Sequence, residues 1–186
     1  GDRIPLWQSM GLCKARVLFG TDTAKSRIQT LIVKTIAASN QKPRLKSEIY
    51  QARLDSEQGA TDRNLKRFQG GTMDIEYIVQ MLQLLNGTAE DIQQPGTLLA
   101  LQKLQEHGLL NEDDTTALSK SYLFLRRVES GLRLMDTTHR HDLPEHPLEL
   151  EKLASLLGYE SPQSLVTVCR RYRRDNRQRF EKIFNR

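Results

Sequence analysis

Two carboxylates follow a pair of glycines in the middle of the chain. A closely spaced pair of carboxylates is a candidate metal site. Asp74 and Glu76 come directly after Gly70 and Gly71, in the run Gln-Gly-Gly-Thr-Met-Asp-Ile-Glu over residues 69–76. Side chains two positions apart on a helix point about 200° from each other. The two carboxylates therefore cannot clamp one metal on a regular helix, and we expect no metal site here.

The glycines themselves allow two structures. They let the backbone adopt a positive φ, or they let a ligand or another chain approach the backbone closely. A helix that begins just after them would present unpaired N–H groups, which suit an anion. Spacing alone favours the simpler structure, a glycine-rich turn capped by Asp74.

The helix that follows has an apolar surface at a spacing of three and four residues, formed by Ile75, Ile78, Val79 and Leu82. We expect it to run through the core. Glu76 and Gln80 are among its few polar residues, and a buried carboxylate needs a basic partner or an exit to solvent. Arg126, Arg127 and Arg16 are chemically suitable partners, and the sequence does not choose among them.

Turn signals elsewhere fall at helix spacing, and no segment alternates with period two. The sequence therefore predicts an all-α fold, a bundle of about seven or eight helices with a long central helix hairpin. The second helix should bury Ile28, Leu31, Ile32, Thr35 and Ile36. The expected helices cover residues 5–19, 22–38, 44–58, 74–85, 97–106, 111–135 and 147–157, and a last one from 162 nearly to the end.

The length of the chain fits one domain, or one domain with a small annex. With 186 residues, 28 Lys and Arg against 23 Asp and Glu, and a net charge of +5, acidic partners are permitted but not required. We expect a single helical domain over 1–186, with N-terminal helices in 1–58, a loop in 59–73 and a core bundle in 74–186. No apolar run is long enough for a membrane span, so we expect no membrane partner. The chain begins without methionine, in the approach to a helix, and we expect a fragment of a larger multidomain protein.

Cysteine and histidine usage adds little chemistry. Cys13 and Cys169 lie far apart, which disfavours a disulfide framework or a zinc site and favours a reducing cytoplasm. His139 and His141, with His146 nearby, could ligate a metal, but solvated loop histidines are the more common outcome of such spacing.

A run of arginines in the last helix has the composition of a nucleic-acid-binding surface. At helical spacing the neighbouring apolar residues face inward and the arginines point outward, so a solvated face is the favoured interpretation. The alternative is a contact surface for an acidic protein or a polyanion. This possible partner surface comprises Arg170, Arg171, Arg173, Arg174 and Arg177.

The central stretch, together with several others in the same order, resembles one family. Residues 66–80 read Lys-x-x-x-Gly-Gly-x-x-Asp-Ile-Glu-Tyr-Ile-Val-Gln and resemble the Gly-Gly-x-x-Asp/Glu-Ile-Glu-Phe-x-x-Gln signature of glutamine synthetase adenylyltransferases. Residues 7–17 resemble the family's Trp-Glu-x-x-Ala-Leu-x-x-Ala-Arg opening, and residues 121–129 its Ala-Tyr-x-Phe-Leu-Arg-x-Leu-Glu helix. The His-x-Leu-Pro loop at 141–144 and the short helix ending in Gly-Tyr at 153–159 continue the match. Phe68-Gln69 departs from the signature, which usually has a glycine in this approach.

The resemblance implies a helical domain that follows a nucleotidyltransferase domain, in a bifunctional bacterial enzyme that adds AMP to glutamine synthetase and removes it. In that family a Gly-Ser motif and an Asp-x-Asp pair bind magnesium and position ATP, and this chain contains no Asp-x-Asp. We therefore expect ATP and magnesium to be used by the parent enzyme, and this fragment alone to bind neither and to be inactive. Glutamine synthetase, the PII signalling protein and the adjoining nucleotidyltransferase domain are the expected partners.

Two features favour the C-terminal, adenylylating half of such an enzyme. One is the sequence Ala-Arg-Val at 15–17 followed by Gly-Thr-Asp at 20–22. The other is Asp74, where the deadenylylating half often has glutamate. The resemblance further implies that Lys66, Gly70, Gly71 and Asp74 face the active site. On the same basis Glu76, Gln80, Arg126 and Arg127 would support this loop through polar contacts in the core.

Two other functions remain open. One is a stand-alone helical binding module that uses the basic C-terminal helix on nucleic acid or an acidic protein, although nucleic acid is the less favoured partner. The other is a structural spacer between the halves of the larger enzyme.

Overall fold

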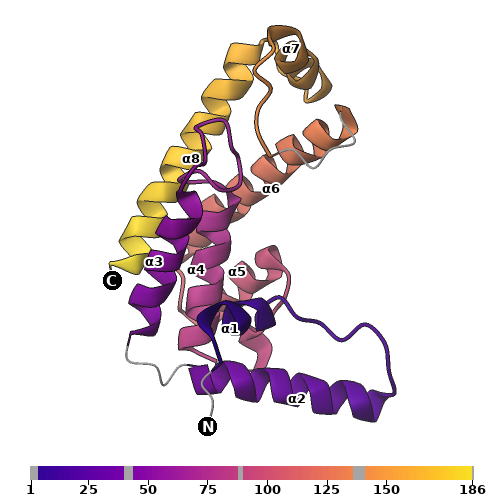
Figure 1. The fold of residues 1–186 in the computed structure, drawn as a ribbon, viewed down its shortest axis with the longest axis vertical. Coiled ribbons are helices and arrows are strands. Elements are labelled where there is room, and N and C mark those ends of the chain that lie inside the picture. Colours follow the sequence, from indigo (N-terminus) through magenta and orange to yellow (C-terminus); the bar gives the residue numbers. More distant parts are fainter. Residues whose placement is uncertain (1–3, 40–43, 88–89, 136–140, 186) are drawn as a thin grey trace. The chain divides into compact units, whose positions relative to one another are not determined.

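The computed structural model describes residues 4–39, 44–87, 90–135 and 141–185, and it confirms the all-α prediction (Figure 1). Within these ranges the chain forms eight α-helices and one 3₁₀ turn, and its only β-type pairing is an isolated bridge between Asn64 and Asp142. The elements are α1 (Leu6–Leu12), α2 (Asp22–Ser39), α3 (Leu45–Glu57), α4 (Thr72–Leu85), η1 (Glu90–Ile92), α5 (Thr97–Glu106), α6 (Glu112–Met135), α7 (Pro147–Leu156) and α8 (Pro162–Phe184).

Helix starts follow the capping residues in the sequence. The side chain of Asn111 accepts a hydrogen bond from the Asp114 N–H at 2.7 Å, just before α6. Ser161 and Ser164 form a reciprocal capping box at the start of α8, where the Ser164 N–H donates to Ser161 Oγ at 3.2 Å. The two longest helices, α6 and α8, therefore begin where local chemistry predicts.

The first helix is shorter than predicted. The spacing of apolar residues indicated a helix over 5–19, but α1 ends at Leu12. Gly11 lowers the helix propensity near its end. Farther along, Leu18 and Phe19 are 75% and 95% exposed, so no buried contact holds a continuation of the helix.

The predicted buried face of α2 is only partly correct. Ile32 and Ile36 are buried, as expected, and Val33 joins them. Ile28 and Leu31 are 46% and 64% exposed. The apolar stripe therefore packs only along the second half of the helix.

The described chain divides into two compact units. Unit 1 comprises Gly1–Ala52 and Glu76–Thr115, and unit 2 comprises Arg53–Ile75 and Thr116–Arg186. Three helices, α3, α4 and α6, contribute residues to both units.

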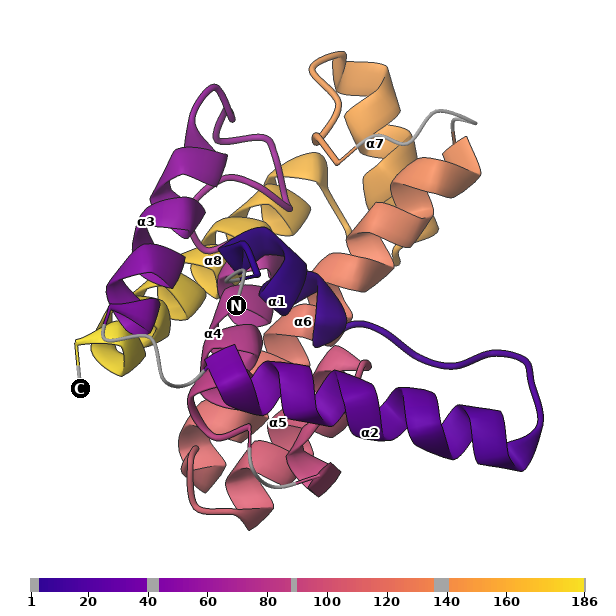
Figure 2. The ribbon, with the colours of Figure 1, turned by 60° about the horizontal axis from the view of Figure 1, so that its bottom comes forward.

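Unit 1 contains α1, α2, η1 and α5, together with parts of α3, α4 and α6. Here α1 packs against α2, as Figure 2 shows, and η1 packs against α5. Gln83 holds the connection after α4, because its side-chain amide donates to the carbonyls of Ile92 and Gln94 at 2.9 Å each. The residues that α4 contributes to the core of this unit are Ile78, Val79, Met81, Leu82 and Leu84.

Unit 2 has a core shared by α6, α7, α8 and the loop before α4, with α7 packed on α8. Phe124 of α6 stacks on Tyr172 of α8, with ring centroids 4.7 Å apart. Leu65 carries the loop into this core. The buried members of the cluster are Leu65, Leu125, Val128, Leu132, Leu143, Leu153, Ala154, Leu157, Leu165 and Cys169.

No helix in the described part of the chain is both long enough and apolar enough to cross a membrane.

Both cysteines are free and buried, Cys13 in unit 1 and Cys169 in unit 2. Burial raises the pKa of each thiol to about 12. At about pH 8 we expect each to react with a thiol reagent at least about a hundredfold more slowly than in the unfolded chain, because reaction requires local opening.

The Cys13→Ser and Cys169→Ser variants each leave one thiol, so the labelling rate of each variant reports on one unit. Fast labelling of the remaining thiol in native protein would contradict its burial.

Candidate functional site

The loop between α3 and α4, residues 58–71, has no regular helix but is closed by backbone hydrogen bonds. The Thr72 N–H donates to the Leu65 carbonyl at 3.0 Å, and the Gly71 N–H donates to the Phe68 carbonyl at 2.8 Å. The Leu65 N–H in turn donates to the His141 carbonyl at 2.8 Å. We call residues 58–71 the double-glycine loop.

Gly70 is the point where this loop meets α8. Its φ is +76°, and a Cβ added there would lie 1.8 Å from the carbonyl oxygen of Arg173. The Gly70 carbonyl accepts a hydrogen bond from the side-chain amide of Asn176 at 2.8 Å. The close approach that the glycine permits is therefore made by the backbone of α8.

Gly71 is confined from the other side. A Cβ at this position would lie 2.4 Å from the Lys66 carbonyl oxygen and 2.7 Å from that of Leu65. Both glycines are thus required by packing within unit 2.

Asp74 joins the loop to α3. The carboxylate is fully buried and accepts the Gly70 N–H at 2.8 Å on Oδ2. Its Oδ1 lies 2.5 Å from an Nη of Arg53, whose side chain is also fully buried. The same Arg53 nitrogen donates to the carbonyls of Arg67 and Phe68 at 3.0 and 3.3 Å. One guanidinium therefore holds both the acid and the loop backbone.

Arg177 of α8 extends this pair into an alternating network of charges. Its guanidinium lies 3.6 Å from Asp74 Oδ2, forms an ion pair with Glu57, and lies 2.8 Å from Glu181. Arg53 also lies 3.3 Å from Glu57. We call Arg53, Glu57, Asp74, Arg177 and Glu181 the buried ion network after its fully buried centre, Arg53 and Asp74; the other three side chains are partly exposed.

Burial is the largest single influence on the pKa of Asp74 and on that of Arg177. It raises the pKa of the Asp74 carboxyl above its ordinary value, while Arg53, Arg177 and the Gly70 N–H act to lower it. For Arg177, burial lowers the pKa, but Asp74, Glu57 and Glu181 outweigh it and the pKa is raised. The carboxylate is thus costly to bury and depends on its partners.

Arg173 corrects the prediction that the arginines of the last helix all project outward. It is only 6% exposed, because this face of α8 lies on the double-glycine loop. Its guanidinium donates to the Asp62 carbonyl, lies 3.5 Å from the Asn64 carbonyl, and sits 5.0 Å from the ring centre of Phe68. Burial lowers its pKa.

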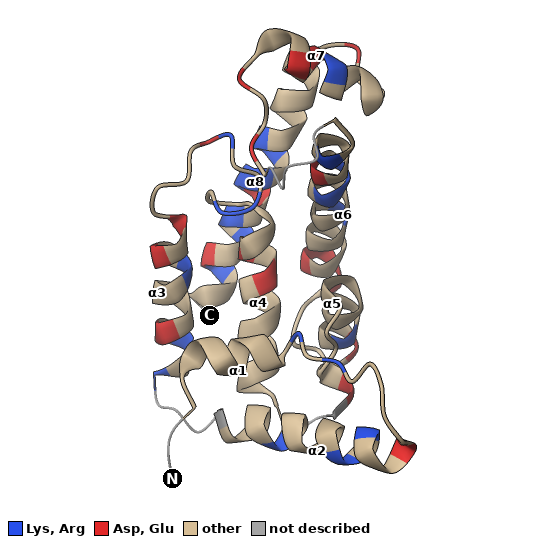
Figure 3. Ribbon diagram, turned by 45° about the vertical axis from the view of Figure 1, so that its right-hand side comes forward, with Lys and Arg blue, Asp and Glu red and all other residues tan. Residues whose placement is uncertain are grey.

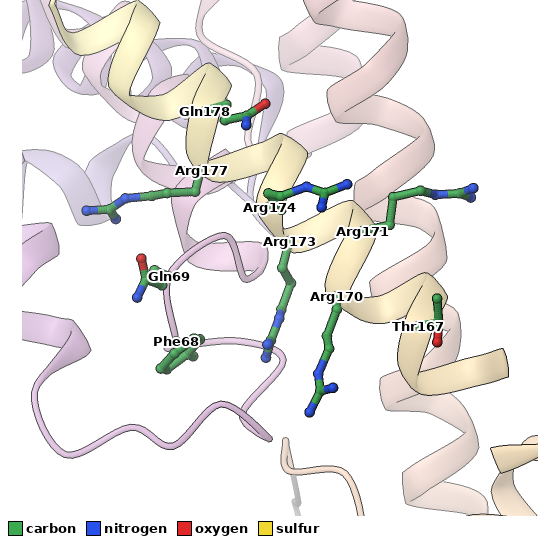
Figure 4. Close-up of a pocket in the computed structure, with 9 residues that line it drawn as sticks. All are labelled: Phe68, Gln69, Thr167, Arg170, Arg171, Arg173, Arg174, Arg177 and Gln178. Atoms are coloured by element: carbon green, nitrogen blue, oxygen red, sulfur yellow. The ribbon is translucent and has the colours of Figure 1, made fainter. Parts of the chain in front are cut away.

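Arg173 and the other four arginines of the predicted partner surface line a pocket of about 720 Å³ beside the same loop (Figure 4). Arg170 and Arg174 have side chains that are 66% and 70% exposed. Figure 3 shows the basic residues of α8 in blue. The lining residues are Phe68, Gln69, Thr167, Arg170, Arg171, Arg173, Arg174, Arg177 and Gln178.

The polar residues expected to support the loop have partners of their own. Glu76, in unit 1, lies 3.9 Å from Lys14, which was not among the partners considered from the sequence. Gln80 is buried at 8% exposure. In unit 2, Arg126 donates to Glu129 at 2.7 Å, and Arg127 donates to the Leu157 carbonyl at 3.1 Å.

The two loop histidines within the described residues have different surroundings. His141 has its Nδ1 3.0 Å from the buried carboxylate of Glu129. His146 is exposed. His139 lies outside the described residues.

Arg53 and Asn176 are two buried site residues that the sequence did not reveal, and the network residues Glu57 and Glu181 were also not predicted. Arg53 continues the four-residue spacing of the buried Leu45 and Ile49 on α3, and that register is the signal that could have identified it. Asn176 lies between arginines in α8, and nothing in the sequence marks it as buried.

One protein-family model matches most of the chain. Residues 41–185 match the family model described as GlnD PII-uridylyltransferase, and the chain belongs to that family.

Curated relatives confirm the resemblance to glutamine synthetase adenylyltransferases. Each of the following is named bifunctional glutamine synthetase adenylyltransferase/adenylyl-removing enzyme. The protein of Ralstonia nicotianae is 32% identical over 132 residues, which is 70% of this chain and 14% of the relative. The protein of Xanthomonas axonopodis is 36% identical over 118 residues, 62% of this chain and 12% of the relative. The protein of Nitrosomonas europaea is 27% identical over 187 aligned residues, 96% of this chain and 20% of the relative. The chain thus spans a fifth or less of these relatives.

Replacing Gly70 by alanine tests the contact with α8. Gly59 provides a matched control, since its φ is +73° and an added Cβ would meet nothing within 4 Å. We expect Gly59→Ala to lower the free energy of unfolding by about 1 kcal/mol and Gly70→Ala by at least about 3 kcal/mol. Urea unfolding followed by far-UV circular dichroism measures both, and equal losses would show that the contact does not matter.

A double-mutant cycle tests the pair of Arg53 and Asp74. Arg53→Met leaves a buried carboxylate with one partner fewer, and we expect it to lower the free energy of unfolding by about 3–5 kcal/mol. Asp74→Asn should cost much less in the Arg53→Met background than alone, with a coupling on the order of 2 kcal/mol. Additive losses in urea unfolding would contradict the coupling.

Proposed function

We propose that this chain is the helical domain that follows a nucleotidyltransferase domain in an enzyme that adenylylates and deadenylylates glutamine synthetase. In this proposal the double-glycine loop forms one wall of the site at which AMP is transferred from ATP to a tyrosine of glutamine synthetase. The family match and the names of the relatives support the parent activity.

The observation that carries the proposal is the set of contacts that hold a loop without regular secondary structure in place. The buried ion network and Asn176 fix the backbone of Gly70 against α8, while Arg67 and Gln69 are exposed and Lys66 is half-buried. A wall of an active site needs such fixed geometry, because small displacements of reacting groups are costly to the rate.

The residues present do not fit a magnesium site. The carboxylate oxygens of Asp74 already contact Arg53 and the Gly70 N–H. Among the described residues, no group of three His, Cys, Asp or Glu side chains is arranged to hold a metal. We therefore assign magnesium and the reacting phosphates of ATP to the adjoining domain. Lys66 is the residue of this chain that we assign to the junction with that domain.

We further propose that the chain comes from the C-terminal, adenylylating half and acts in the cytoplasm, with glutamine synthetase and the PII signalling protein as partners. The sequence features at 15–22 and Asp74 support this half.

Lys66→Gln in the full-length parent enzyme tests two claims: that the double-glycine loop lies at the active site, and that the chain belongs to the adenylylating half. This substitution removes a cation without filling the loop, and the side chain of Lys66 forms no hydrogen bond or ion pair with the described residues. We expect AMP transfer to glutamine synthetase to fall on the order of tenfold, since a cation near the phosphates favours the charge that develops there. AMP removal should be unchanged.

The control is Lys152→Gln, at an exposed lysine of α7, which should leave both reactions unchanged. Full AMP transfer in the Lys66 variant would refute the placement of the loop. Loss of AMP removal alone would refute the assignment to the adenylylating half.

A further inference from the structure

The pocket beside the double-glycine loop is lined by hydrogen-bond donors and contains no acidic side chain. Five of its lining residues are arginines, and Gln69, Thr167 and Gln178 supply neutral donors. Phe68 adds an aromatic ring. Such a lining is chemically matched to an anion with many acceptor oxygens.

Arg173 shows that the local charge is incompletely balanced within the chain. Its side chain is 94% buried, and its partners are two backbone carbonyls and the Phe68 ring. Its Nε has no hydrogen-bond partner. The carboxylate of Asp62 acts to raise the pKa of Arg173, but this carboxylate is exposed and pairs with Arg170, and burial outweighs it. A buried cation whose nearby carboxylate is exposed and shared with another arginine is incompletely compensated, and an anion bound in the pocket would relieve this cost.

The neighbouring arginines add positive charge that is weakly compensated. Arg170 lies 3.5 Å from Asp62 and Arg174 lies 3.9 Å from Asp175, both at exposed positions where such pairs contribute little. Arg171 contacts the ring of Tyr172 at 5.4 Å. Arg177 is the exception, because the buried ion network already holds it.

We propose that this pocket binds a small oligophosphate, a chain of linked phosphate groups that is free or carried by a nucleotide. Guanidinium groups bind phosphate oxygens in pairs of hydrogen bonds, and successive arginines on one helix face can contact successive phosphates. The volume of about 720 Å³ accommodates a compact molecule of this class. Arginine supplies the charge here, so binding needs no metal, which separates this pocket from the magnesium-dependent transfer site.

The inference does not rest on the proposed function, and the test needs only the 186-residue chain. Isothermal titration with inorganic triphosphate in EDTA should give saturable binding to one site. Arg170→Gln/Arg174→Gln should weaken it on the order of tenfold to a hundredfold, because two charge-assisted contacts are lost. Both side chains are exposed, so this variant should keep its circular dichroism spectrum.

Arg133→Gln/Lys152→Gln is the matched control, with the same loss of charge at exposed positions of α6 and α7 in the same unit. It should leave the affinity within about twofold of the unsubstituted chain. Equal weakening by the two double variants would show diffuse attraction by net charge and overturn the proposal, as would an absence of saturable binding.

Two further ligands separate the possible sources of the anion. ATP in EDTA that binds more tightly than triphosphate identifies a nucleotide, whereas equal affinity identifies the phosphate chain alone, and both results support the proposal. A decaglutamate peptide that binds more tightly than triphosphate would overturn it in favour of an acidic protein segment.

Discussion

The buried pair of Arg53 and Asp74 is the interaction on which the double-glycine loop depends. A loop without helix or strand must satisfy its backbone groups by other means. Here the guanidinium binds two loop carbonyls and the carboxylate binds a loop N–H, so the pair replaces the hydrogen bonds of regular structure. Burying two charges is costly, and only this number of simultaneous contacts makes the arrangement favourable.

The same pair links elements that are distant in the sequence. Arg53 belongs to α3 and Asp74 to α4, while α8 contributes Arg177 and Asn176 to the same loop. Each of these contacts holds a residue that also takes part in another contact. The parts of α3, α4 and α8 that lie in unit 2 are therefore positioned together. Glycine at position 70 is the steric counterpart of this electrostatic linkage, since it admits the α8 backbone to the loop.

How far the sequence could predict this structure depended on the range of the interactions. Helix starts such as Asn111 and Ser161 are set by neighbouring residues, and these were predicted correctly. The buried state of Arg53 and Arg173 is set by segments far away in the sequence. An arginine is ordinarily assigned to solvent, so Arg173 was predicted to project outward, and Arg53 was not recognised although its register on α3 is that of buried residues. Asn176 was missed for the same reason. The prediction of a longer first helix was wrong for a different reason: the apolar residues Leu18 and Phe19 are exposed and pack against no other element of the described chain.

The arginine run of α8 illustrates how one charged stretch can serve two purposes. Helical periodicity places Arg177 in the buried ion network, where carboxylates on three segments compensate its positive charge. The same periodicity leaves Arg170 and Arg174 exposed, each paired with one exposed carboxylate at 3.5 and 3.9 Å. Arg173 lies between these groups, buried yet bound only to neutral oxygens and a ring. The excess positive charge of the helix is therefore concentrated on the pocket side rather than spread around it. This asymmetry follows from packing against the loop, so the requirement that fixes the double-glycine loop also creates the basic pocket beside it.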